Sequence, residues 1–460
     1  MRPVFFLLVL LALSACTGPV DDPYPASERG QSIYYSAFSE PPKHLDPARS
    51  YSSNETPFTG QIYEPPLQYQ YLKRPYQLVP LTATAVPKPS YYDAGGHLLA
   101  ASAPAAKIAE SVYEIHIRPG IRYQPHPAFV TNQPIPDDAQ AIPDFPEQAT
   151  RELTADDYVY EIKRLASPKL QSPIAGLMSG YIIGFSDLSR KLDAAAKTEK
   201  GWLDLRRFKL AGVETVDRYT YRIHIKGKYP QFVYWLAMSF FAPVPWQADA
   251  FYSRPGMAER NLTLDNWPVG TGPYMLTVNQ PNRQMRLVRN PNFHGEAYPS
   301  EGEPGDKAAG LLKDAGKPMP FIDQAVYSRE SETIPYWNKF LQGYYDASGI
   351  SSDNFDQAVR TGTAGNVELT PEMKAKGIHL RTAVETSDYY IGFNMLDPVV
   401  GGLDDRHRKL RQAISIAIDE EEYIAIFANG RGIPAQGPLP PGIFGYRAGK
   451  AGVNPEVYDS

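Results

Sequence analysis

Apolar and polar residues alternate along several short segments of this chain, and a period of two predicts β-strands. The alternation is clear over 112–118 and 220–226, and a further strand is expected over 32–38. Residues 274–288 contain two alternating runs, with a turn at 279–282 that is rich in asparagine and proline. Because these residue types favour turns, this stretch predicts a β-hairpin.

A period near 3.6 residues predicts helices elsewhere. Thr154 begins one of them, because an apolar stripe follows it and Asp157 has the spacing of a capping box. Asp419 has the same relation to Glu422 in a later helix that ends at Gly430. The other helices are predicted over 232–238, 333–341 and 410–418, and a last strand is expected over 389–394.

Three segments show no sustained period and are rich in proline, glycine, alanine or charged residues. They span 83–108, 124–148 and 296–320. Such composition favours loops over packed elements, so we interpret all three as insertions between regular elements.

The first residues carry an export signal. Arg2 precedes an apolar run, Val4 to Leu13, that is too short to span a bilayer as a helix. The run ends in Leu13-Ser14-Ala15-Cys16, which has the form of a lipobox. We therefore predict a signal peptide over 1–15, lipidation of Cys16 and a tether up to residue 30. The protein is then expected to be periplasmic or at the cell surface, attached to the membrane through its lipid anchor.

Composition serves mainly to exclude functions. The 460 residues carry a formal net charge of -5, so a nucleic-acid partner is not expected. Cys16 is the only cysteine, which rules out a disulfide within the chain. The sequence contains no familiar catalytic motif and no pair of histidines at metal-ligand spacing, so we expect neither an enzyme nor a metal or other cofactor.

Five short motifs, spread along the chain in a fixed order, resemble those of one protein family. The motifs are Leu45-Asp46-Pro47, Val269-Gly270-Thr271-Gly272-Pro273-Tyr274, Arg289-Asn290-Pro291-Asn292-Phe293, Phe393-Asn394 and the run from Leu410 to Asp419. Together they resemble the family 5 solute-binding proteins of bacterial ABC transporters, which include oligopeptide and dipeptide binders.

This resemblance implies an α/β fold with mixed sheets, the type II periplasmic-binding-protein fold with two lobes and an extra subdomain. Lobe I is expected over 31–60 and 206–390, and the inserted subdomain over 61–205. Lobe II is expected to begin within 391–460 and to be incomplete at Ser460, through either a fragmentary record or a truncated gene.

The resemblance also implies a function. We expect the protein to capture oligopeptides and to deliver them to the permease subunits of an ABC importer by hinged closure of its lobes. By position in the family, the candidate ligand-binding residues are Tyr51, Ser53, Ile174, Phe393 and Asn394. Another small solute (an oligosaccharide, a nickel chelate or haem) stays an alternative cargo, and an envelope factor without a transport role is the alternative from another class.

Overall fold

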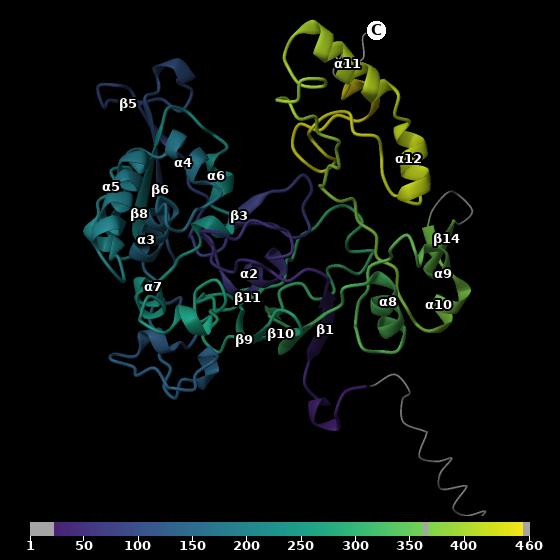
Figure 1. Cartoon of the computed structure of the whole chain (residues 1–460), viewed down its shortest axis with the longest axis horizontal. Coiled ribbons are helices and arrows are strands. Elements are labelled where there is room, and N and C mark those ends of the chain that lie inside the picture. Colours follow the sequence, from purple (N-terminus) through teal and green to yellow (C-terminus); the bar gives the residue numbers. More distant parts are fainter. Residues whose placement is uncertain (1–22, 362–366, 454–460) are drawn as a thin grey trace, which may run out of the picture. The chain divides into compact units, whose positions relative to one another are not determined.

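The computed structural model describes residues 23–361 and 367–453 (Figure 1). Its Cα positions group into two compact units, which are described separately. Among the described residues, the first unit contains 23–72, 77–332 and 339–347, and the second contains 73–76, 333–338, 348–361 and 367–453. The predicted signal peptide and Cys16 lie outside the described residues.

A four-stranded sheet forms one part of the first unit, in the order β1-β13-β10-β9. The predicted hairpin is confirmed as β9 and β10, with its turn at 281–283 and a bulge between Arg286 and Leu287. Strand β1 runs parallel to β13, and helix α2 packs its buried face against β9. The elements are β1 (Ile33–Phe38), α2 (Thr56–Ile62), β9 (Tyr274–Gln280), β10 (Gln284–Arg289) and β13 (Gln324–Arg329).

A five-stranded antiparallel sheet forms the other part, in the order β5-β4-β6-β8-β7. The strands predicted over 112–118 and 220–226 are confirmed as β6 and β8, which pair with Tyr113 opposite Ile223. The interpretation of 83–108 as a loop was wrong in part, because β4 and β5 lie within it. The strands are β4 (Ser90–Tyr92), β5 (Leu98–Leu99), β6 (Glu110–His116), β7 (Val213–Asp217) and β8 (Thr220–Lys226).

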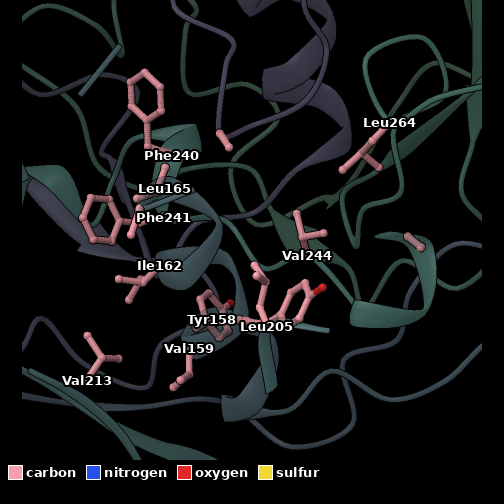
Figure 2. Packing of buried hydrophobic residues seen from close by; sticks show 14 of the residues in the cluster. Tyr158, Val159, Ile162, Leu165, Leu205, Val213, Phe240, Phe241, Val244 and Leu264 are labelled. Atoms are coloured by element: carbon pink, nitrogen blue, oxygen red, sulfur yellow. The ribbon is translucent and has the colours of Figure 1, made fainter. Parts of the chain in front are cut away.

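Helices cover this second sheet, and α3 is the most deeply buried of them. Ile162 and Leu165 of α3 lie beside Phe241 in the core shown in Figure 2. The predicted cap is confirmed, since the Asp157 carboxylate accepts from the Thr154 amide at 3.0 Å. Helix α6 is shorter than expected. The helices of this region are α3 (Ala155–Leu165), α4 (Ala175–Tyr181), α5 (Phe185–Thr198), α6 (Phe232–Trp235) and α7 (Trp246–Tyr252).

The two other predicted insertions differ from each other. Segment 124–148 is part of the core and not a loose excursion, because it buries Ala139, Ile142 and Phe145. Segment 296–320 is mostly irregular, and only its two ends pair. The short elements of the first unit are strands and 3-10 helices, and the 3-10 helices are written η. They are η1 (Ala26–Glu28), β2 (Leu67–Tyr69), β3 (Leu78–Pro80), η2 (Ala105–Lys107), η3 (Pro127–Phe129), η4 (Ile142–Asp144), η5 (Leu205–Arg207), η6 (Ser239–Phe241), η7 (Ala258–Arg260), β11 (Glu296–Ala297) and β12 (Pro318–Met319).

The second unit contains the helices predicted near the end of the chain. The Asp419 carboxylate accepts from the Glu422 amide at 2.9 Å, as the capping-box spacing predicted. Helices α11 and α12 bury none of their described residues. The elements are α8 (Thr333–Leu341), which crosses the unit boundary, and then α9 (Phe355–Ala358), β14 (Val359–Thr361), β15 (Val367–Leu369), α10 (Pro371–Ala375), α11 (Asp405–Ile416), α12 (Glu420–Phe427) and η8 (Gly449–Ala451).

The strand expected over 389–394 was wrong, because these residues form no regular element and Tyr389, Tyr390 and Ile391 are exposed. A strand needs a neighbour for its backbone groups, and none of the strands in the described part of the chain pairs with this segment. Within residues 23–361 and 367–453, no helix has the length and apolar character needed to cross a membrane.

Candidate ligand-binding loop

The Leu45-Asp46-Pro47 motif anchors the start of the loop at 48–55. The buried Asp46 carboxylate accepts from both terminal nitrogens of Arg164, at 2.9 and 2.6 Å. One Asp46 oxygen also accepts from the Ala48 amide at 3.0 Å. Arg164 belongs to α3, so this pair joins the loop to a helix that lies 118 residues later in the sequence.

Arg164 holds two carboxylates in the interior, because Glu161 also accepts from it at 2.8 Å. Burial works against the charge of Arg164, but attraction from Asp46 and Glu161 outweighs it and raises the pKa of the guanidinium. Burial raises the pKa of the Glu161 carboxyl well above its usual range, although the charge of Arg164 opposes this. Such a cluster fixes geometry, since loss of one member leaves an uncompensated buried charge.

The end of the loop is organised by the buried side chain of Glu55. Its Oε1 atom accepts from the amides of Lys43 at 3.2 Å and His44 at 2.8 Å. Its Oε2 atom accepts from the Ser50 hydroxyl at 3.0 Å and from the amides of Tyr51 at 2.9 Å and Ser52 at 3.1 Å. Five donors therefore converge on one carboxylate, and the backbone between them is held in one conformation.

Two predicted binding residues stand on this fixed backbone with exposed side chains. Tyr51 is 72% exposed, and its ring centroid lies 6.3 Å from that of Phe240 in η6. Ser53 is also exposed, between the Tyr51 amide and Glu55. The loop thus presents one aromatic face and one hydroxyl from a scaffold that is ordered by buried charges.

The motif from Val269 to Tyr274 is buried except at Pro273, which is half-buried, and it has a structural role. A Cβ atom at Gly270 would lie 1.9 Å from the carbonyl oxygen of Ile62, so only glycine allows this approach. The Thr271 hydroxyl donates to Glu64 at 2.7 Å, and the other Glu64 oxygen lies 2.8 Å from Nε2 of His294. Glu64, which lies two residues after the end of α2, thus joins the motif to His294, the residue after Arg289–Phe293.

The other predicted site residues lie elsewhere. Ile174 precedes α4 in the core and is only 4% exposed. Phe393 is half-buried and Asn394 is exposed, and both belong to the second unit. The Asn394 side chain accepts from the Leu396 amide at 3.1 Å. The structure therefore brings Tyr51 and Ser53 together on one loop, and the roles of all five residues stay predictions.

Sequence reasoning missed Glu55, Glu161 and Arg164. Glu161 left a signal, because it lies three residues after Tyr158 and four before Leu165, on the apolar stripe of α3. A charge on such a stripe indicates a buried partner. Glu55 left no comparable signal, since its donors are backbone amides of an irregular loop.

Comparison with known proteins identifies the family of this chain. Residues 98–459 match the model of the bacterial extracellular solute-binding proteins, family 5, middle region. A curated relative, heme-binding protein A of Haemophilus influenzae, is 23% identical over 334 residues, which cover 73% of this chain and 47% of the relative. The chain thus spans about half the length of this relative.

Solved structures resemble the fold. OppA of Burkholderia pseudomallei has a TM-score of 0.56 at 16% identity, over 89% of this chain and 60% of that one. DppA of Helicobacter pylori, in complex with the peptide STSA, has a TM-score of 0.56 at 16% identity, over 92% of this chain and 64% of that one. At this identity the likeness concerns the fold, which is that of the two-lobed periplasmic binding proteins.

Proposed function

Because this chain belongs to the bacterial extracellular solute-binding proteins of family 5, we propose that it captures oligopeptides and delivers them to an ABC importer. Members of this family bind solutes and are not enzymes. The peptide in the structure of the Helicobacter pylori protein, which shares the fold, supports this cargo.

The ordered loop at 48–55 is the observation that carries the proposal. Tyr51 and Ser53 are exposed on a backbone that Asp46 and Glu55 already hold in place. A loop ordered in advance loses little conformational entropy when a ligand binds, so more of the contact energy appears as affinity. An exposed tyrosine also gives a large contact face to side chains of varied sequence.

Delivery requires a change that the importer can recognise. We propose that lobe I, over 31–60 and 206–390, closes on a lobe that begins near 391, with Phe393 and Asn394 at the crossing. Contacts that the ligand makes only in the closed state would drive this closure. The inserted subdomain over 61–205 shares its sheet with lobe I, since β6 pairs with β8. A lipid on Cys16 would keep the protein at the membrane.

Haem is the alternative cargo that one observation favours, because a curated relative is a heme-binding protein. An oligosaccharide or a nickel chelate, and a role in the envelope without transport, are the remaining alternatives. Dependence of binding on the free ends of a peptide separates the proposal from all of them.

Calorimetry with a defined tripeptide and its N-acetylated form tests the proposal. We expect saturable binding of the free tripeptide, and a loss of about tenfold in affinity for Tyr51→Ala, as for a contact residue of moderate weight. Leu98→Ala is the control, because Leu98 is another exposed large apolar residue, at the edge of the second sheet. Binding of haem without binding of any peptide would overturn the proposal.

A further inference from the structure

A cavity of about 800 Å³ lies in the first unit, at a site separate from the loop at 48–55. Its walls come from residues 128–134, at and after η3, from Thr150 and Arg151, and from α7 together with Arg254, which follows that helix. Helix α7 packs against η3. The wall at 128–134 belongs to segment 124–148, which sequence analysis interpreted as an insertion. The volume is in the usual range for sites that hold small organic molecules.

Two arginines line this cavity, and none of its lining residues is acidic. The charge of Arg151 is neutralised by Asp157, because the Nη1 atom of Arg151 donates to the Asp157 carboxylate at 2.9 Å. The Nε and Nη2 atoms of Arg151 both donate to the Gln247 side chain, at 3.1 and 3.0 Å. Arg151 is therefore already satisfied by the protein and has the role of a fixed wall.

Arg254 differs from Arg151. No hydrogen bond or ion pair of its guanidinium is found among the described residues, and its Cζ atom lies 5.6 Å from the ring centroid of Phe251. Arg254 is half-buried at the cavity wall. A cation in this position leaves a net charge of one in the cavity that a ligand could neutralise.

Gln133 supplies a second, independent indication. Its side chain is 4% exposed, and its Nε2 atom has no hydrogen-bond partner in the described part of the chain. A buried amide without a partner costs free energy, so a structure retains one where something else satisfies it. The acceptor that this amide lacks is a group that an anionic ligand carries.

The largest of the remaining lining side chains are the aromatic Phe129, Trp246 and Phe251, and the others are small, aliphatic or uncharged polar. We propose that this cavity is a binding site for a small organic monocarboxylate with an aromatic or aliphatic body. The carboxylate pairs with Arg254 and accepts from the Gln133 amide, and the body packs against the three aromatic rings. This site is independent of peptide capture, because no residue of the loop at 48–55 lines the cavity.

Fluorine NMR of the full chain labelled with fluorotryptophan tests this site directly. The chain contains five tryptophans, and Trp246 lines the cavity whereas Trp267 is buried elsewhere in the same unit. Trp246→Phe identifies the resonance of Trp246. We expect naphthoate to shift that resonance saturably and to leave Trp267 in place, and we expect the neutral analogue naphthamide to bind at least about tenfold more weakly.

Two variants isolate the groups that recognise the carboxylate. Arg254→Met and Gln133→Leu keep the approximate size of each side chain, and each should weaken naphthoate binding, Arg254→Met by about tenfold or more. Arg190→Met is the matched control, because Arg190 is an arginine of α5 whose side chain is 75% exposed. Circular dichroism verifies that each variant is folded. If Arg254→Met does not fold, the affinity of Gln133→Leu for naphthoate decides the test.

Three results would overturn the proposal. The Trp246 resonance could stay unmoved up to about 1 mM naphthoate, an affinity too weak for a built site. Naphthamide could bind as tightly as naphthoate, or Arg254→Met as tightly as the unmodified chain. None of these outcomes affects the tripeptide measurement, so the two sites succeed or fail separately.

Discussion

Acid should destabilise this protein through His126, a buried histidine next to the cavity wall. The Nδ1 atom of His126 accepts from the Ala128 amide at 3.1 Å, so Nε2 carries the proton and donates to the Tyr252 hydroxyl at 2.9 Å. That hydroxyl in turn donates to the Trp267 carbonyl at 2.6 Å. A second proton on the ring would face the Ala128 amide, and burial accordingly lowers the pKa of His126 to about 3.

The sign and size of the effect follow from this pKa. The unfolded chain takes up a proton near the ordinary value of 6.5, whereas the folded chain resists protonation until about 3. The contribution of His126 to stability is therefore complete above about 6.5 and falls as the pH decreases towards 3. Between pH 7.5 and pH 5 the loss is about 2 kcal/mol, since each pKa unit corresponds to about 1.4 kcal/mol.

Urea unfolding followed by tryptophan fluorescence at several pH values measures this loss. His126→Asn keeps an acceptor for the Ala128 amide but does not titrate, so its free energy of unfolding should fall about 2 kcal/mol less over this range. His97→Asn is the control, because the His97 side chain is 81% exposed. If His126→Asn and the unmodified chain showed the same pH dependence, the assignment of a neutral buried histidine would be refuted.

Three further substitutions test the scaffold of the loop and of the glycine motif. Arg164→Met leaves two buried carboxylates without their cation and should cost about 3–5 kcal/mol in urea unfolding, and a cost below about 1 kcal/mol would contradict the buried cluster. Glu55→Gln removes one of two accepting oxygens, so amide hydrogen exchange at residues 43–52 should accelerate, whereas unchanged exchange would show that the carboxylate does not order the loop. Gly270→Ala should prevent normal folding, because the added Cβ would collide with the Ile62 carbonyl oxygen. The control, Gly60→Ala in α2, should be neutral or stabilising by about 1 kcal/mol. Equal thermal stability of the two variants would contradict the close approach at Gly270.

The sequence predicted helices and strands well where the element is long enough to show a period of apolar and polar residues. Strands β6 and β8 were visible because apolar residues alternate with charged or histidine residues over 113–118 and 221–226. Strands β4 and β5 were not visible, since three and two residues are too few to show a period. Their pairing could not be inferred either, because β4 pairs with both β5 and β6, and β5 pairs with β4. The segment at 389–394 has strand composition, but composition supplies no partner strand.

The candidate site shows the same limit more sharply. The resemblance to a family placed Tyr51 and Ser53 on one loop, and the structure shows both exposed there. The pair that fixes the start of the loop, Asp46 and Arg164, is separated by 118 residues, so its partners could not be matched from the sequence. Segment 124–148 was interpreted as an insertion for the same reason, because its packing against α7 depends on residues about a hundred positions later.

Native mass spectrometry of the protein isolated from the cells that produce it tests the central claim most directly. The account predicts that gentle release yields short peptides of mixed sequence, because the proposed contact residues Tyr51 and Ser53 are exposed on a loop whose backbone Glu55 holds in place. Release of haem, or of one other non-peptide compound in place of peptides, would contradict peptide capture by this chain.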